Sequence, residues 1–108
     1  MRKHQRPAPR PAETDLLARA RRHRRRGEHR RAMLVMREAC YRVLDDARLW
    51  TLYAVACVRA GRRDEAVSAL KQAVWLRERD RHVDKARVTL ALLAGLLAGD
   101  DAFRVAAA

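Results

Sequence analysis

The chain has little of what most small folds need. Its 108 residues include no Ile, no Asn, one Phe, three Pro, four Gly and two Cys. A β-sandwich or barrel needs β-branched and aromatic residues between frequent turns, and a disulfide scaffold needs more than two cysteines. A membrane protein needs an apolar stretch of about 20 residues, and charges interrupt every candidate stretch in this chain. The sequence therefore predicts one small all-α domain with no membrane span.

Arginine is abundant instead, and its charge is concentrated near the N-terminus. The formal net charge is +12. Residues 1–31 hold 12 basic and 3 acidic residues, whereas residues 32–108 hold 13 basic and 10 acidic ones. The excess of 22 Arg over 3 Lys is typical of the coding bias of a G+C-rich, bacterial genome. The sign and position of the charge therefore carry more information than the choice of Arg over Lys.

Residues 1–12 form a basic arm that contains all three prolines, Pro7, Pro9 and Pro11. Proline opposes helix formation, so we expect this arm to be non-helical. It has no apolar core of the kind that a signal peptide needs, which favours a cytoplasmic location. The arm is either a solvated tail, which we favour, or an electrostatic tether to nucleic acid.

Three glycines mark a period of 34 residues: Gly27, Gly61 and Gly95. A fixed period in this range indicates a repeat architecture. Large apolar residues and alanines obey the same shift, which predicts repeats over 13–46 and 47–80. The related pairs are Leu16 with Trp50, Ala20 with Ala54, Ala32 with Ala66, Met36 with Leu70, and Ala39 with Ala73.

Each repeat is predicted to be two helices joined at its glycine, which takes up the left-handed conformation after the first helix. Apolar residues recur at helical spacing along each predicted helix. Acidic residues open the helices, where they complement the helix dipole or cap free N–H groups. These acidic residues are Glu13 and Asp15, Asp45 or Asp46, and Asp64 and Glu65.

The second repeat resembles a tetratricopeptide repeat, as its large, small and glycine positions show. These positions are Leu49 to Ala54, Cys57, Gly61, Ala66, Leu70 and Ala73. The first repeat resembles the family through Leu16, Ala20, Gly27, Ala32, Met36 and Ala39, with Arg19 and His23 where apolar residues are usual. The resemblance implies a short α-solenoid of antiparallel helix pairs that binds another protein.

Residues 81–108 are predicted to form a partial third repeat and a closing helix. The helix runs from Val83 or Asp84 to about Ala98, in a register set either by Gly95 or, one turn later, by Gly99. Asp100 and Asp101 are placed to cap a short last helix over 102–106. The face of the closing helix that we expect to pack on the second repeat consists of Val88, Ala91, Leu92 and Leu96.

No set of residues with the spacing of a catalytic or metal site is found, so we expect neither an enzyme nor a cofactor. Cys40 and Cys57 fall on helix positions that face the core, where burial is the simpler explanation. The four histidines lack metal-ligand spacing, and the glycines lie too far apart for a phosphate loop.

In tetratricopeptide repeats the first helix of each pair lines a concave groove. Carried over by that resemblance, the partner-binding residues are Thr14, Leu17, Arg21, Arg24 and Arg25, then Arg48, Thr51, Val55, Val58 and Arg59, and in the Gly95 register Lys85, Thr89, Leu92 and Leu93. The implied groove is basic at one end and apolar towards the other. It suits an acidic peptide with an apolar anchor, because arginine binds carboxylates in bidentate fashion.

The arginines of the first predicted helix have two other interpretations. The six arginines within Arg19–Arg26 form either a simple solvated helix face or, with the basic arm, a surface for nucleic acid. Against nucleic acid, Trp50 and Tyr53 are assigned to packing, which leaves no stacking platform.

Two repeats and one closing helix are few for independent stability, so self-association or docking onto a partner is expected to stabilise the domain.

Overall fold

The computed structural model describes residues 11–99, and all regular structure in this part of the chain is helical. The expectation of an all-α fold is therefore confirmed for these residues. Residues 1–10 of the expected arm and the expected last helix over 102–106 lie outside the described residues. The helices are α1 (Pro11–Arg25), α2 (His29–Arg42), α3 (Ala47–Arg59), α4 (Arg63–Arg79) and α5 (Val83–Leu97).

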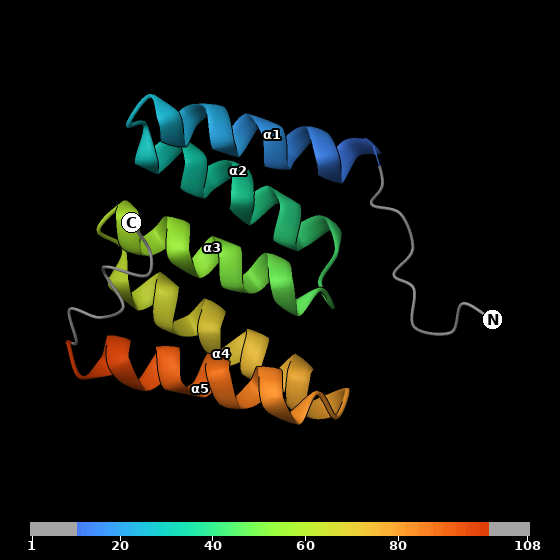
Figure 1. The fold of residues 1–108 in the computed structure, drawn as a ribbon. Helices are drawn as coiled ribbons and strands as arrows, with labels where there is room; N and C mark the ends of the chain where they lie inside the picture. Colours follow the sequence, from blue (N-terminus) through green and yellow to red (C-terminus); the bar gives the residue numbers. More distant parts are fainter. Residues whose placement is uncertain (1–10, 100–108) are drawn as a thin grey trace.

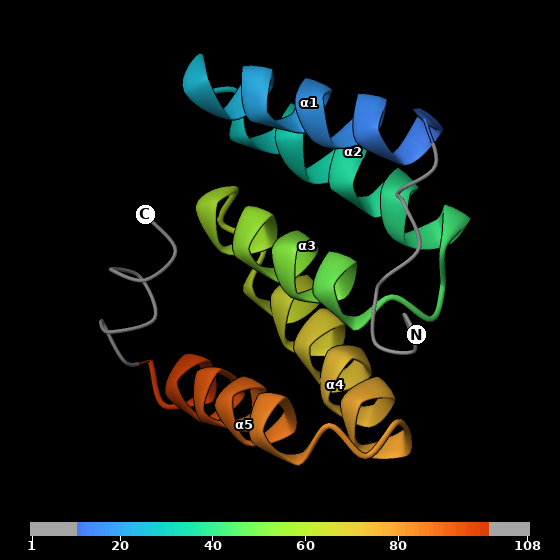
Figure 2. The same ribbon diagram turned by 45° about the vertical axis from the view of Figure 1, so that its right-hand side comes forward.

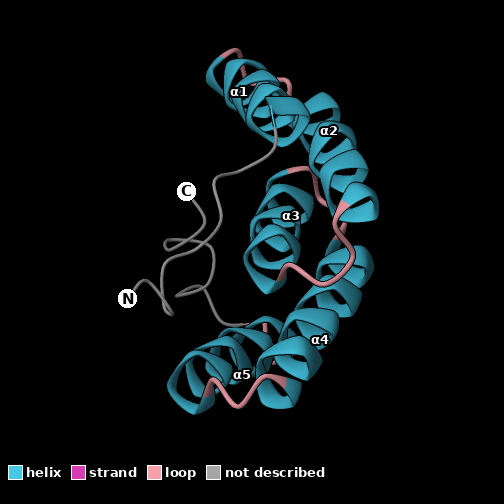
Figure 3. Ribbon diagram, turned by 90° about the vertical axis from the view of Figure 1, so that its right-hand side faces the viewer, coloured by secondary structure: helices cyan, strands magenta, loops and turns pink. Residues whose placement is uncertain are grey.

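The helices follow one another in space in the same order as in the sequence. Each packs mainly against the helix before it and the helix after it (Figures 1 and 2). Seen from the side, they form a crescent, with α1, α3 and α5 towards its inner side and α2 and α4 along its outer side (Figure 3). Because α2, α3 and α4 each have a neighbour on both sides, these three helices carry most of the core.

The chain reverses direction three times through the same kind of turn, at Gly27, Gly61 and Arg81. Their φ angles are 74°, 74° and 59°, in the left-handed region. In each turn this residue donates its N–H to the carbonyl three residues back, and the next residue donates to the carbonyl five residues before it. These hydrogen bonds, of 2.8–3.1 Å, define a Schellman motif. The helices therefore form hairpins α1–α2, α3–α4 and α4–α5.

The helix after each turn buries the same positions, counted from the turn residue. The residues at plus five, plus eight and plus twelve are buried every time. At plus five the residue is always alanine, which lets the two helices of the hairpin approach closely. The buried sets are Ala32, Val35 and Ala39 in α2, Ala66, Ala69 and Ala73 in α4, and Ala86, Thr89 and Leu93 in α5.

The packing face of α5 differs from the one expected. Val88 and Ala91 were expected to pack inward and are exposed, whereas Ala86 and Thr89 are buried. Gly95 lies inside α5 and forms no turn, whereas Gly99 follows its end with a φ of 71°. The physical reason is the turn at Arg81. This turn places the buried positions of α5 twenty residues after those of α4, whereas the expected register placed them 34 residues after those of α3.

Polar groups hold the ends of two helices. Asp46 caps α3, its carboxylate accepting hydrogen bonds from the N–H groups of Arg48 and Leu49 at 2.9 and 3.2 Å. At the other end of the crescent, the Arg63 guanidinium donates to the carbonyl oxygens of Leu96 and Leu97 at 2.6 and 2.8 Å. This contact satisfies carbonyls that the end of a helix leaves free, and it ties α5 to the first turn of α4.

Candidate functional site

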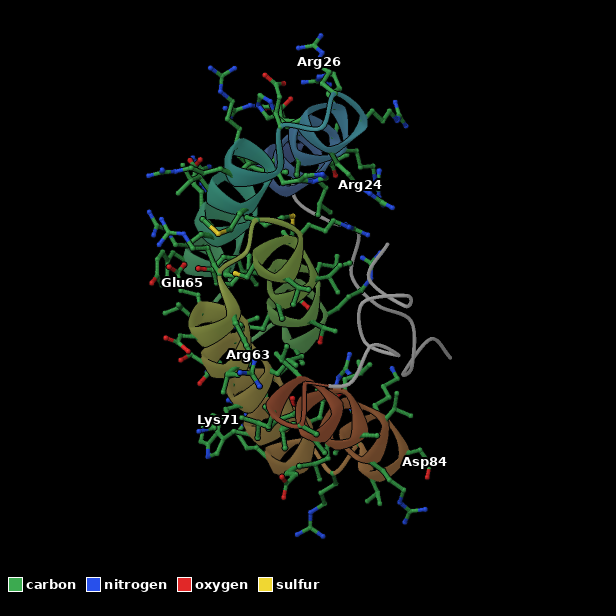
Figure 4. All side chains as sticks on the ribbon, turned by 90° about the vertical axis from the view of Figure 1, so that its left-hand side faces the viewer. Arg24, Arg26, Arg63, Glu65, Lys71 and Asp84 are labelled. Carbon is green, nitrogen blue, oxygen red and sulfur yellow. The ribbon has the colours of Figure 1, made fainter. Side chains whose placement is uncertain are left out.

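A cavity of about 170 Å³ opens on the inner side of the crescent, between α1 and α3 and in front of α2. Figure 4 shows Arg24 on this side of the molecule and Glu65 on the opposite side. The lining residues come from all three helices: Leu17, Ala20, Arg21 and Arg24 from α1, Ala32 and Met36 from α2, and Arg48, Leu52, Val55, Ala56 and Arg59 from α3.

Four arginines give this cavity its charge, and among the described residues that line it none is acidic. Arg21 and Arg24 are one helical turn apart on α1, and Arg48 and Arg59 stand at opposite ends of α3. Partial burial, followed by repulsion from Arg24, lowers the pKa of the Arg59 guanidinium. The two cations therefore repel each other at the same cavity, which favours an anion there.

The floor of the cavity is apolar. Leu17, Leu52 and Val55 are partly buried and pack against the core, and Met36, which also lines the cavity, is buried. Alanines at other lining positions keep the floor open, because a larger side chain would fill the space. The cavity thus combines a small hydrophobic surface with a basic rim, which suits an acidic segment that carries one apolar side chain.

Six of the residues expected from the sequence line the cavity, and others do not. Thr51 is half-buried and donates its hydroxyl to the carbonyl of Ala47 at 2.9 Å, and Val58 packs against the core. Thr14 and Arg25 are exposed on α1 and do not line the cavity. Those that do are Leu17, Arg21, Arg24, Arg48, Val55 and Arg59.

The residues expected from α5 are not part of the groove. Thr89 is buried, accepts a hydrogen bond from Arg77 of α4 and donates to the carbonyl of Lys85 at 2.7 Å. Leu93 is also buried, so the expectation is wrong for Thr89 and Leu93. Lys85 is exposed and Leu92 half-buried, and neither lines the cavity. The apolar part of the site lies beneath the arginines and not at the far end of the crescent.

Leu52 also lines the cavity and was not among the residues predicted from the sequence. Its position could have been found, because Arg48, Leu52, Val55 and Arg59 follow one another at intervals of four, three and four residues. Such spacing places them on one face of a helix.

A second cavity, of about 510 Å³, lies on the outer side of the crescent, among α2, α3 and α4. Its wall includes Tyr41, Trp50 and Tyr53, with successive ring centroids 6.2 Å apart in edge-to-face contact. Charges of both signs line it, from Arg37 and from Asp64 and Glu65 in the first turn of α4. Glu65 accepts a hydrogen bond from the Tyr53 hydroxyl at 3.2 Å, so these two side chains have a structural role in joining α3 to α4.

The two cysteines are part of the core, as expected. Cys40 and Cys57 are fully buried and form no disulfide. Burial raises the pKa of the Cys40 thiol to about 12 and that of the Cys57 thiol to about 11. Neither is therefore an activated nucleophile.

Within residues 11–99 no three His, Cys, Asp or Glu side chains come together as a metal ion would require. None of the helices described there is both long enough and apolar enough to cross a membrane. No protein-family model, curated protein or solved structure matches the chain.

Proposed function

We propose that the chain is a protein-interaction module that captures an acidic segment of a partner protein in the cavity between α1 and α3. The observation that carries this proposal is the lining of that cavity. Four arginines surround an apolar floor, and none of the described residues that line it is acidic. A surface of this kind attracts anions, and it has the shape to hold one inserted side chain.

The chemistry of arginine supports a carboxylate as the group that is bound. Each guanidinium presents donors in a planar fork that matches two carboxylate oxygens. A carboxylate placed between Arg24 and Arg59 also relieves the repulsion between them. Binding an acidic segment therefore gains hydrogen bonds and removes an unfavourable interaction, while an apolar side chain of the same segment packs on Leu52 and Val55.

The proposal includes the form of the domain, a short α-solenoid similar to tetratricopeptide repeats. It is supported by the shared turns at Gly27 and Gly61 and by the residues that match at a spacing of 34. In this form the first helix of each pair faces the partner. The position of the basic cavity on α1 and α3 agrees with that arrangement.

The test is a binding titration with a labelled synthetic peptide of aspartates and glutamates around one leucine, followed by fluorescence anisotropy. The double variant Arg24→Glu with Arg59→Glu is expected to bind about 100-fold more weakly, because hydrogen bonds between charged groups contribute about 1.5–3 kcal/mol each. The matched control, Arg22→Glu with Arg30→Glu, makes the same change in net charge at exposed positions that do not line the cavity. The affinity of this control for the peptide should fall by less than about threefold.

Equal loss in the two double variants would contradict the proposal, because it would mean general attraction to a basic surface. The same two variants test the alternative of nucleic-acid binding in a gel-shift series from about 50 to 200 mM salt. Tight binding of nucleic acid that both variants weaken alike, with no binding of the acidic peptide, would replace the peptide site by a phosphate-binding surface.

A further inference from the structure

Helix α5 exposes apolar residues at positions that are covered in the earlier helices. Nine residues after each turn stand Met36 in α2, Leu70 in α4 and Leu90 in α5. The first two are 5% and 0% exposed, whereas Leu90 is 46% exposed. Helix α2 is followed by α3, which packs against it, and α4 is followed by α5. Within the described residues no further helix packs on α5, so its corresponding face is open.

The open face carries a stripe of three exposed apolar residues, with the exposed Arg87 beside it between Val83 and Leu90. Val83, Leu90 and Leu97 are spaced by seven residues, two helical turns, so they lie in one line along about 21 Å of the helix. Val83 and Leu97 are 62% and 54% exposed, and Ala94 lies beside them. A row of this length matches the side of another helix and not a single inserted side chain.

We infer that a second copy of this chain covers the stripe, by an antiparallel pairing of α5 with α5 about a two-fold axis. The stripe is symmetric about its middle residue, since Leu90 is seven residues from both Val83 and Leu97. In an antiparallel pair Leu90 therefore meets Leu90 of the other copy, and Val83 meets its Leu97. A surface that matches itself in this way is what a two-fold dimer requires.

The distribution of charge favours the same partner. Residues 83–99 contain only Asp84, Lys85 and Arg87 as charged residues, whereas residues 14–31 contain eight arginines and two acidic residues. Helices α1 and α5 lie at opposite ends of the crescent (Figure 1). Pairing through α5 thus joins two strongly cationic molecules by their least charged ends and keeps the arginine-rich ends apart. It also leaves the cavity between α1 and α3 open in both copies.

The first experiment measures the mass of the full chain in solution by sedimentation or light scattering. The wild-type chain is expected to be a dimer at about 100 µM and to dissociate on dilution, since one helix pair makes a small interface. Leu90→Glu should be monomeric at every concentration while keeping its helical circular-dichroism signal. Val88→Glu is the matched control, because Val88 is 61% exposed on the same helix but lies away from the stripe. It should remain dimeric.

The second experiment tests the geometry by oxidative cross-linking of single cysteine variants of the full chain. Leu90→Cys is expected to form a covalent dimer, because residue 90 lies at the two-fold axis and its copies fall within disulfide range. Val83→Cys and Leu97→Cys should each cross-link poorly alone and readily when mixed. The native cysteines do not interfere, since both are fully buried.

Several results would overturn the inference. One is a wild-type chain that stays monomeric at about 100 µM. Another is a dimer that Val88→Glu abolishes as fully as Leu90→Glu does. A monomeric wild type that Leu90→Glu strongly destabilises would show instead that residues 100–108 of the same chain cover the stripe.

Discussion

Helices α4 and α5 make an informative pair, because each follows the same kind of turn and buries the same positions. Ala66 and Ala86 hold the close contact in their hairpins, five residues after Gly61 and Arg81. The two helices differ in what lies on their other side. Helix α4 is enclosed between α3 and α5, whereas α5 has α4 alone as its main neighbour among the described helices. The same register therefore yields a core position in one helix and an open one in the other, as Leu70 and Leu90 show.

The largest difference is expected when Leu70 and Leu90 are truncated to alanine. Leu70→Ala should lower the free energy of unfolding by about 2–5 kcal/mol, because it removes a fully buried side chain and leaves a cavity. Leu90→Ala should lower it by less than about 1 kcal/mol, since the side chain is already half in water.

Urea denaturation at about 1 µM protein, where a weak dimer is dissociated, measures both values. Similar losses in the two variants would mean that α5 is covered within one chain, and the comparison between α4 and α5 would no longer hold.

A smaller effect is expected at the turns. Gly61→Ala should destabilise the chain by about 1 kcal/mol, because alanine resists a positive φ, while the space around its Cβ is open. Arg81→Gly is the reverse substitution in the third turn, because it replaces a side chain by glycine at a positive φ. It should stabilise the chain by about 0.5 kcal/mol, since the relief of the positive φ outweighs the greater freedom that glycine gives the unfolded chain.

Thermal or urea unfolding of both variants gives the comparison. Loss of stability in Arg81→Gly would mean that the Arg81 side chain contributes more than its backbone conformation costs. That result would separate the third turn from the other two.

The smallest effect concerns pH at the first turn, where Glu28 follows Gly27. A hydrogen bond with His23 at 3.1 Å and then the charge of Arg31 lower the pKa of the Glu28 carboxyl. Its stabilising contribution is therefore present above the pKa that glutamate has in the unfolded chain, and it is lost as the pH falls through the folded value.

NMR titration of Glu28 should give a pKa below that of an unfolded peptide, and His23→Gln should move it back towards the usual range. An unchanged titration in the variant would exclude His23 as the cause. The third turn has His82 in place of Glu28, so no corresponding acid titration is expected there.

The first two hairpins could be predicted from the sequence because their signals agree. Gly27 and Gly61 mark the turns, Asp46 caps α3 as one of two expected residues, and Cys40 and Cys57 lie in the core. Helix α1 begins at Pro11, within the expected arm, because proline is well accommodated in the first turn of a helix.

The register of α5 could not be predicted, because its turn carries no glycine. Nothing in the sequence marks Arg81 as the left-handed residue, and Gly95 happens to continue a spacing that ends at Gly61. A misplaced turn rotates the whole helix, which is why Val88 was expected inside and Thr89 outside. From sequence alone, an apolar residue such as Leu90 also looks like a core residue, although no other described helix covers its side of α5.

The cavity was predictable in outline. The arginines on α1 and α3 were found because the face of a helix follows from its spacing. Val58 and Thr51 do not line the cavity, since the angle between α3 and its neighbours decides which edge of that face stays open. That angle is a tertiary property, and no local pattern reports it.

Because Cys40 and Cys57 are buried, their modification by a thiol reagent measures how often the protein opens. In the closed helices both thiols are shielded and almost entirely protonated at neutral pH. A thiol reagent can therefore modify them only in molecules that have transiently opened around α2 or α3. The rate of labelling under native conditions measures how often each helix comes loose, and a bound acidic peptide that bridges α1 and α3 should slow it.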